Sequence, residues 1–281
     1  MRFLFSTGSL YTYSITRCFG FAASAGFDGM ELMVDERWDT RQLGYIQSLV
    51  SQYKLPVVAV HAPLRLIPGW EMGVPAHIKS TVKMAEHLDA DLVVHHLPMR
   101  FGFGMLRIQS RQYLVPFPWW SMHKDYILWL KREYSQFQTT TNVQLCIENM
   151  PATHLFGQQW NPSPWNTIET IQRFTSLTMD TTHLGTWNLE PVEVYSRWAG
   201  RVKHIHLSNY NGRQHRRPED GDLRLDHLVA HLAETGYNGT ISIETSPDAL
   251  DAGCDDEHMV KLLTNSLQYC RSWAVSGAHV I

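Results

Sequence analysis

Residues 144–151 read QLCIENMP, an apolar run of strand-forming residues that ends in the carboxylate of Glu148 and is closed by a proline. Five other segments follow the same plan, in which an apolar run ends in a histidine or an acid close to Pro, Asn or Thr. They are VVAVHAP (57–63), DLVVHHLP (91–98), SLTMDTTH (176–183), VKHIHLSN (202–209) and TISIETSP (240–247). The polar residues that end the six runs are His61, His95, Glu148, Asp180, His206 and Glu244. In a parallel α/β fold all strand C-termini lie at one end, so these side chains are expected to meet in one mouth.

Strand-like and helix-like segments alternate eight times along the chain. The expected strands cover 2–8, 29–34, 56–63, 91–97, 144–150, 177–182, 202–208 and 240–245, and the expected helices 14–25, 40–53, 75–88, 121–138, 164–175, 191–198, 225–235 and 255–273. This alternation predicts a parallel sheet with helical crossovers, and eight units predict a closed (β/α)8 TIM barrel, an α/β fold, formed by residues 1–281 as a single domain. The two-residue period of a strand directs Val58 and Val60 toward the helices and His61 into the barrel.

Two connections are longer than the others, near 98–120 and 209–224, and both follow expected strands. They therefore belong to the catalytic face, where long loops usually act as lids or binding loops. The first carries five large aromatic residues, Phe101, Phe103, Phe117, Trp119 and Trp120. These rings would either stack on a sugar or a base, or pack against one another or an oligomer partner.

The composition of the chain disfavours a nucleic acid partner, a membrane-spanning protein and a secreted protein. The net charge of −3 provides no overall basic field, which disfavours nucleic acid as a partner. No apolar run approaches the roughly 20 residues that a membrane span requires, and the apolar part of the N-terminal segment is too short for a secretion signal. The four cysteines show no CxxC spacing, which favours a reducing, cytoplasmic setting.

Four of the residues at the run ends, Glu148, Asp180, His206 and Glu244, form the strongest candidate metal site. Oxygen and imidazole ligands without a thiolate suit Mn, Mg, Co or Zn. The alternative interpretation is that each acid caps a loop amide and that the histidine is a polar core residue.

A second metal would use His61 and His95, unless these two histidines bind substrate hydroxyls or a phosphate instead. Strand alternation lets only one of His95 and His96 point inward, and His95 is expected to do so because it follows the apolar run directly.

Further candidates lie beside these positions. Glu31 ends a strand and would either anchor the substrate by hydrogen bonds or form a structural ion pair. His183 and His215 would serve a further metal or the substrate, whereas His204, which lies deeper, is expected to fill the barrel. Arg213 in the 209–224 loop would reach an oxyanion or phosphate of the substrate, and Trp119 would contact it. The neighbouring Arg216 and Arg217 are expected to be solvated.

The chain resembles the xylose isomerase-like TIM barrel superfamily, which holds sugar isomerases and epimerases and also endonuclease IV. The resemblance covers nearly the whole chain and rests on motifs that occur in family order. These motifs are GFDGMEL (26–32), VHAPL (60–64), IENMP (147–151), MDTTH (179–183), HIHLSN (204–209) and GYNGTISIET (236–245).

The resemblance implies ligand sets for two branches. In ketose 3-epimerases one divalent metal is held by residues that match Glu148, Asp180, His206 and Glu244. In endonuclease IV three zinc ions use further ligands, and the matching positions here include His61, His95, His183 and His215. One zinc ligand of that enzyme is an aspartate where this chain has Arg213. A cation cannot ligate zinc, which argues against a full three-zinc site.

The expected function is that of a divalent-metal-dependent sugar isomerase or epimerase. Glu148 and Glu244 would transfer a proton next to a carbonyl, through a metal-bound ene-diolate. The alternatives are a zinc phosphodiesterase or abasic-site endonuclease of the endonuclease IV type, and a sugar-acid dehydratase or lyase relative. The expected partner is a small sugar or sugar-derived molecule, and a homo-oligomer is open because epimerase relatives often pair through their catalytic-face loops.

Overall fold

The computed structural model describes residues 1–64, 67, 69–99, 102–108, 111–117, 123–155 and 158–278. Eight parallel strands close into a barrel, and each begins within one residue of its expected start. They are β1 (Arg2–Ser6), β2 (Gly29–Met33), β3 (Val57–His61), β4 (Leu92–His96), β7 (Gln144–Glu148), β10 (Leu177–Asp180), β11 (Val202–Leu207) and β12 (Thr240–Ile243). Their order around the barrel is β1-β12-β11-β10-β7-β4-β3-β2. The predicted TIM barrel is confirmed.

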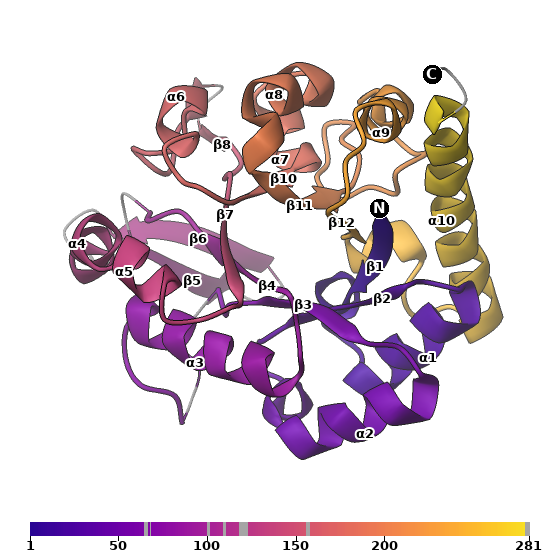
Figure 1. The fold of residues 1–281 in the computed structure, drawn as a ribbon, viewed down its shortest axis with the longest axis horizontal. Helices are drawn as coiled ribbons and strands as arrows, with labels where there is room; N and C mark the ends of the chain where they lie inside the picture. The colour runs from indigo at the N-terminus through magenta and orange to yellow at the C-terminus, as the bar shows by residue number, and fades with distance from the viewer. Residues whose placement is uncertain are drawn as a thin grey trace.

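Helices surround the barrel on the outside (Figure 1). They are α1 (Ile15–Ala25), α2 (Leu43–Tyr53), α3 (Val74–His87), α4 (Lys124–Arg132), α5 (Tyr134–Gln138), α6 (Ile168–Ile171), α7 (Thr181–Thr186), α8 (Pro191–Trp198), α9 (Leu225–Glu234) and α10 (Asp256–Ala278). The last helix, α10, packs against both α1 and α9, so the two ends of the chain close the ring of helices. No helix in the described ranges has the length and hydropathy needed to cross a membrane.

Three helical regions differ from the sequence expectation. The helix expected over 121–138 is two helices, α4 and α5, which meet at Glu133. The helix expected over 164–175 is present only as the single turn of α6, which has Thr167 as its N-terminal cap. An unexpected helix, α7, begins directly after β10, because Asp180 accepts a hydrogen bond from the backbone N–H of His183 and so caps its first turn.

The apolar core has two parts. The larger part fills the space between the barrel and the helices, and a smaller cluster of Leu4, Val58, Ala59, Leu92, Val94 and Cys146 fills the barrel itself. The expected outward orientation of Val58 is therefore wrong. The pairing of β2 with β3 shifts register between Met30 and Glu31, and this irregularity breaks the two-residue alternation at Val58.

The segment expected to be a long loop near 98–120 contains regular structure. It forms an antiparallel hairpin of β5 (Gly102–Ile108) and β6 (Arg111–Phe117). A second, shorter hairpin of β8 (Thr153–Leu155) and β9 (Gln158–Trp160) follows β7. Both hairpins follow the C-terminal ends of barrel strands, so they belong to the face that carries the strand-end polar residues.

Candidate functional site

Four neighbouring strands bring the predicted metal-binding residues together. Glu148 ends β7, Asp180 ends β10, His206 lies in β11 and Glu244 directly follows β12. Each of the four side chains is buried, and each offers one ligand atom within 4.8 Å of the ligand atoms of the others. Strand register sets this convergence, since Asp180 pairs with His206 across β10 and β11. Their role as metal ligands stays a prediction.

The centre of this group is the Nδ1 atom of His206. It lies 2.9 Å from Glu244 Oε2, 3.1 Å from Glu148 Oε1 and 3.7 Å from Asp180 Oδ2. Its other ring nitrogen, Nε2, lies 3.1 Å from Glu31 Oε2, below the group. One imidazole is thus surrounded by four carboxylates from four different strands or strand ends.

Hydrogen bonds fix Asp180 in this position. The side chain of Asn149 accepts from the Asp180 backbone N–H at 2.8 Å and donates to the Asp180 carbonyl at 3.0 Å. Asp180 Oδ1 accepts from the His183 backbone N–H at 2.8 Å. Sequence reasoning missed the positioning role of Asn149, although its place directly after Glu148 in IENMP was a usable signal.

The charges in the group shift one another's pKa values. Burial opposes ionisation of Glu148, but the charges of His206 and His96, with hydrogen bonds from His206 and His61, hold the pKa of its carboxyl well below its usual range. Burial by itself would raise the pKa of Glu244. The charge of His206, together with the hydrogen bond from its ring, outweighs this effect and lowers the pKa. Burial alone would lower the pKa of His206, yet Glu31, Glu244 and Glu148 raise it well above its usual value. The site therefore attracts positive charge.

The donor set suits a divalent cation. Asp180 Oδ2 is buried and has no hydrogen-bond partner, which is a costly arrangement for a carboxylate oxygen unless a cation satisfies it. A side chain at Gly8 would also crowd the group, since a Cβ atom there would come within 3.2 Å of Glu244 Oε1. Three carboxylates and one imidazole are ligands that Mn, Mg, Co and Zn accept.

A second group of candidate ligands shares Glu148. Its Oε2 atom lies 3.3 Å from His61 Nε2 and 2.9 Å from His96 Nε2, and these three residues can also hold a metal. His61 therefore faces the mouth, as expected.

The expected inward orientation of His95 is wrong. Its ring lies between the barrel and the helices, with Nδ1 2.8 Å from the hydroxyl of Tyr126 and Nε2 3.1 Å from the hydroxyl of Tyr134. The reason is strand parity: Leu92 and Val94 belong to the barrel-filling cluster, so His96 follows them inward and pairs in register with Glu148. Burial lowers the pKa of His95 to about 3, so its imidazole is neutral.

We expect substitutions at these two adjacent histidines to have different effects. His95→Ala should cost about 2–4 kcal/mol of stability, because it leaves a cavity and removes a partner from two buried tyrosine hydroxyls. It should leave the metal content of the folded protein unchanged. His96→Ala should cost little stability, since this side chain is partly exposed, and should impair the site. Urea denaturation and metal analysis of both variants would check this, and a stable His95→Ala protein with less bound metal would contradict the assignment.

The remaining predicted histidines lie beside the metal-binding quartet, the group of Glu148, Asp180, His206 and Glu244. His183 lies on α7, with Nδ1 2.7 Å from the Asn149 carbonyl and 3.6 Å from Asp180 Oδ2. His215, in the 209–224 loop, forms with Asp180 and His183 a third set of atoms able to hold a metal.

Below the quartet, His204 Nε2 lies 2.7 Å from Glu31 Oε2, which places this pair deep in the barrel, as predicted for His204. Glu31 contacts two histidines there and has no exposed surface, which argues against the substrate anchor. With His204 and His206 it also forms a set of atoms that could hold a metal.

The arginines of the 209–224 loop differ from expectation. The Arg213 side chain is 74% exposed and pairs with Asp248 at 3.7 Å, so in this structure it points to solvent rather than into the mouth. Arg216, expected to be solvated, is only 16% exposed because it is held between Asp220 and Asp248. Arg217 is likewise largely covered and pairs with Glu219. Trp119 lies outside the described residues.

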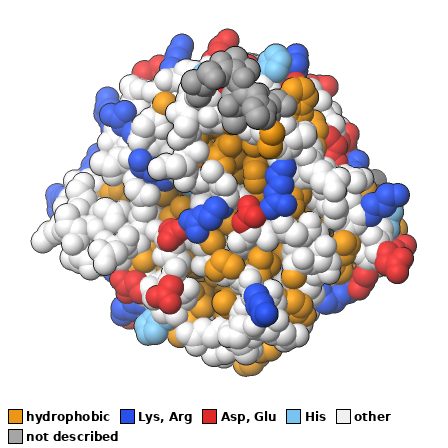
Figure 2. All heavy atoms as spheres, turned by 45° about the vertical axis from the view of Figure 1, so that its right-hand side comes forward, with side chains coloured by type: hydrophobic (Ala, Val, Ile, Leu, Met, Phe, Trp, Pro, Cys, Tyr) orange, Lys and Arg blue, Asp and Glu red, His pale blue; other side chains and the backbone are white. Residues whose placement is uncertain are grey.

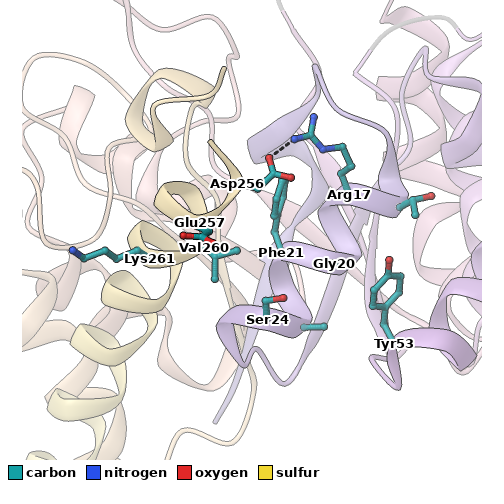
Figure 3. Close-up of a pocket in the computed structure, with 11 residues that line it drawn as sticks. Arg17, Gly20, Phe21, Ser24, Tyr53, Asp256, Glu257, Val260 and Lys261 are labelled. Atoms are coloured by element: carbon teal, nitrogen blue, oxygen red, sulfur yellow. Dashed lines mark hydrogen bonds and ion pairs between the residues drawn. The ribbon is translucent and has the colours of Figure 1, made fainter. Parts of the chain in front are cut away.

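A separate recess lies on the outside of the barrel, between α1, α2 and α10. Figure 2 shows hydrophobic side chains gathered on this side of the molecule among scattered charged ones. In the recess itself Arg17 of α1 pairs with Asp256 of α10, and Tyr53 of α2 lines the side away from α10 (Figure 3). Its lining contains no histidine, so it does not compete with the mouth as a site of metal chemistry.

Comparisons with known proteins agree with this architecture. The sequence model of the family described as xylose isomerase-like TIM barrel matches residues 19–264. An uncharacterized protein of Mycobacterium leprae is 24% identical over 299 residues, which cover 95% of this chain and 96% of that protein.

Two solved structures show the same fold. A D-tagatose 3-epimerase-like protein superposes with a TM-score of 0.64 at 20% identity, covering 97% of this chain and 99% of that one. An AP endonuclease, family 2, from Brucella melitensis superposes with a TM-score of 0.63 at 15% identity, covering 88% and 93% of the two chains.

Proposed function

This chain belongs to the xylose isomerase-like TIM barrel family, and from that premise we propose that it is a divalent-metal-dependent isomerase or epimerase of a small sugar. One observation carries the proposal. The buried ligand atoms of Glu148, Asp180, His206 and Glu244 lie within 4.8 Å of one another, and Asp180 Oδ2 has no hydrogen-bond partner. The similarity in fold to a D-tagatose 3-epimerase-like protein is consistent with a sugar substrate.

The proposed chemistry divides between a cation and two carboxylates. A divalent cation held by the four residues would supply positive charge that stabilises the negative charge developing on the sugar when a proton leaves the carbon next to the carbonyl. Glu148 and Glu244 are the proton-transfer groups: one removes the proton next to the carbonyl, and the other returns it. His206 lies between the two carboxylates, and His61 and His96 hold the outer oxygen of Glu148.

Deuterium exchange tests this proposal directly. The purified protein, supplied with Mn²⁺, is incubated in D₂O with a set of unphosphorylated and phosphorylated ketoses, and proton NMR follows the carbon next to the carbonyl. The expected result is loss of that proton signal with conversion to an isomer or epimer. Conversion of no sugar in the set and no exchange, with metal bound, would argue against the function.

A second candidate function is metal-dependent phosphodiester hydrolysis, as in an endonuclease. The observation that favours it is the pair of additional ligand groups beside the quartet, His61 with His96 and Glu148, and Asp180 with His183 and His215. Metal analysis separates the two functions. About one ion per chain supports the isomerase or epimerase, whereas two or more tightly bound zinc ions, with cleavage of DNA that contains an abasic site, support hydrolysis.

A further inference from the structure

A pocket outside the barrel differs from the recess beside α1 in its charge. It lies between α4 and α5 on one side and the segment around α6 on the other, and its volume is about 640 Å³. That volume falls in the range of roughly 300–1,000 Å³ that is usual for small-molecule sites. Thr175, in its wall, lies two residues before β10 begins, so the pocket extends toward the end of the barrel opposite the mouth.

Two cations line this pocket, Lys131 from α4 and Arg173 from the segment after α6, and no carboxylate lines it. Neither cation forms an ion pair within the part of the chain that the structure describes. In the recess beside α1, by contrast, Arg17 is already neutralised by Asp256 (Figure 3). On a chain of net charge −3, an unpaired pair of cations in one hollow is a feature that an anion would complement.

Aromatic rings form another part of the wall. The rings of Trp165 and Phe174 lie 6.1 Å apart at 37°, and the ring of Tyr134 meets Phe174 edge-on at 5.8 Å. The Lys131 ammonium lies over the Trp165 ring, 5.9 Å from its centre, so this cation stands above one face of that ring. Aromatic faces of this kind stack on planar rings of ligands.

Unused hydrogen-bond donors complete the pocket. The hydroxyl groups of Ser135 and Thr175 form no hydrogen bond among the described residues, and both line the same hollow as the two cations. Phosphate and carboxylate groups accept hydrogen bonds from both hydroxyl and cationic donors.

We propose that this pocket binds a small molecule that consists of a planar ring bearing a phosphate or a carboxylate. The anionic group lies between Lys131 and Arg173, and the ring packs on Phe174 and on the part of Trp165 that Lys131 does not cover. The proposal is independent of the chemistry in the mouth, because none of the pocket residues belongs to the metal-binding quartet.

Calorimetric titration with phenyl phosphate, benzoate and inorganic phosphate tests the site. Phenyl phosphate or benzoate should bind, and phenyl phosphate should bind at least about fivefold more tightly than inorganic phosphate, because only the aromatic anion gains stacking on the rings of the pocket. The phenyl phosphate and benzoate arms show which anionic group the site prefers. Absence of binding by both aromatic anions would overturn the proposal.

Charge variants locate the binding. The double substitution Lys131→Gln with Arg173→Gln should weaken binding of the aromatic anion at least about tenfold. Its control, Lys124→Gln with Arg132→Gln, removes the same charge from α4 alone, outside the pocket, and should stay within about twofold of the natural protein. An equal loss in the control, or no loss in the pocket variant, would refute the site.

Two further variants separate the parts of the proposal. Trp165→Leu should weaken phenyl phosphate more than inorganic phosphate, because it removes the stacking face and keeps both cations. Asp180→Asn, in the mouth, should leave binding of the aromatic anion unchanged, and a loss there would place the binding in the mouth instead. Since the two charge substitutions are on exposed side chains, they decide the question even if Trp165→Leu does not fold.

Discussion

Replacing Glu244 with glutamine is expected to lower kcat of the sugar interconversion by about 10²–10⁴-fold, the usual contribution of a general acid or base. Glutamine keeps the size of the side chain and one oxygen donor but cannot accept the transferred proton. Binding of metal and sugar should therefore be retained in large part. Glu148→Gln should behave in the same way, since the two carboxylates act in turn on opposite steps.

The matched control is Glu193→Gln, the same chemical change at an exposed position on α8. It should keep normal kcat. The measurement is kcat and KM for whichever ketose shows exchange in D₂O, with metal content determined on the same samples. Normal turnover in Glu244→Gln would remove this residue from the proton-transfer step.

Divalent metal is expected to raise the melting temperature of the protein by about 5–10 °C. A ligand at 100 times its dissociation constant stabilises the folded state by about 2.7 kcal/mol, and 1 kcal/mol corresponds to roughly 2–4 °C for a chain of this size. The physical reason is that a cation would neutralise the carboxylates around His206, in particular Asp180 Oδ2, which has no hydrogen-bond partner. Differential scanning calorimetry with EDTA and then with added Mn²⁺ would measure the shift.

Asp180→Asn should abolish most of this response, because Asp180 Oδ2 has no hydrogen-bond partner, whereas oxygens of Glu148 and Glu244 lie 2.9 Å from a histidine. Asparagine can still accept the hydrogen bond from the His183 N–H that begins α7, so the fold should persist while the charge is lost. Asp248→Asn is the control: it removes an exposed carboxylate near Arg213 and Arg216 and should leave the metal response intact. An undiminished metal-induced shift in Asp180→Asn would show that the cation binds elsewhere.

The barrel was predictable because its signals are local. Each barrel strand is a short apolar run closed by a turn residue, and the eight runs alternate with helical segments. The same pattern identified Glu148, Asp180, His206 and Glu244, because a polar residue at the C-terminal end of a barrel strand lies at the mouth when its side chain points inward. Helix α7 was not predicted, because Asp180 was interpreted only as a metal ligand and not as the N-terminal cap of a helix.

The sequence alone did not determine which side chains of a strand point into the barrel. The adjacent residues His95 and His96 are chemically identical, and an apolar run does not reveal which parity faces inward when the strand is buried on both sides. Packing decided it: Leu92 and Val94 fill the barrel, so His96 lies beside Glu148 and His95 binds Tyr126 and Tyr134.

The sequence by itself determined the βα period, the closed barrel and the chemical types gathered at its mouth, because strand length, turn residues and terminal polar residues are local properties. Only the tertiary structure decided which side chains touch. Arg213 turns outward to Asp248 while Arg216 becomes covered, and Asn149 reaches across to Asp180. Such contacts join residues that are far apart in the chain, and their geometry depends on register and packing, which no local pattern encodes.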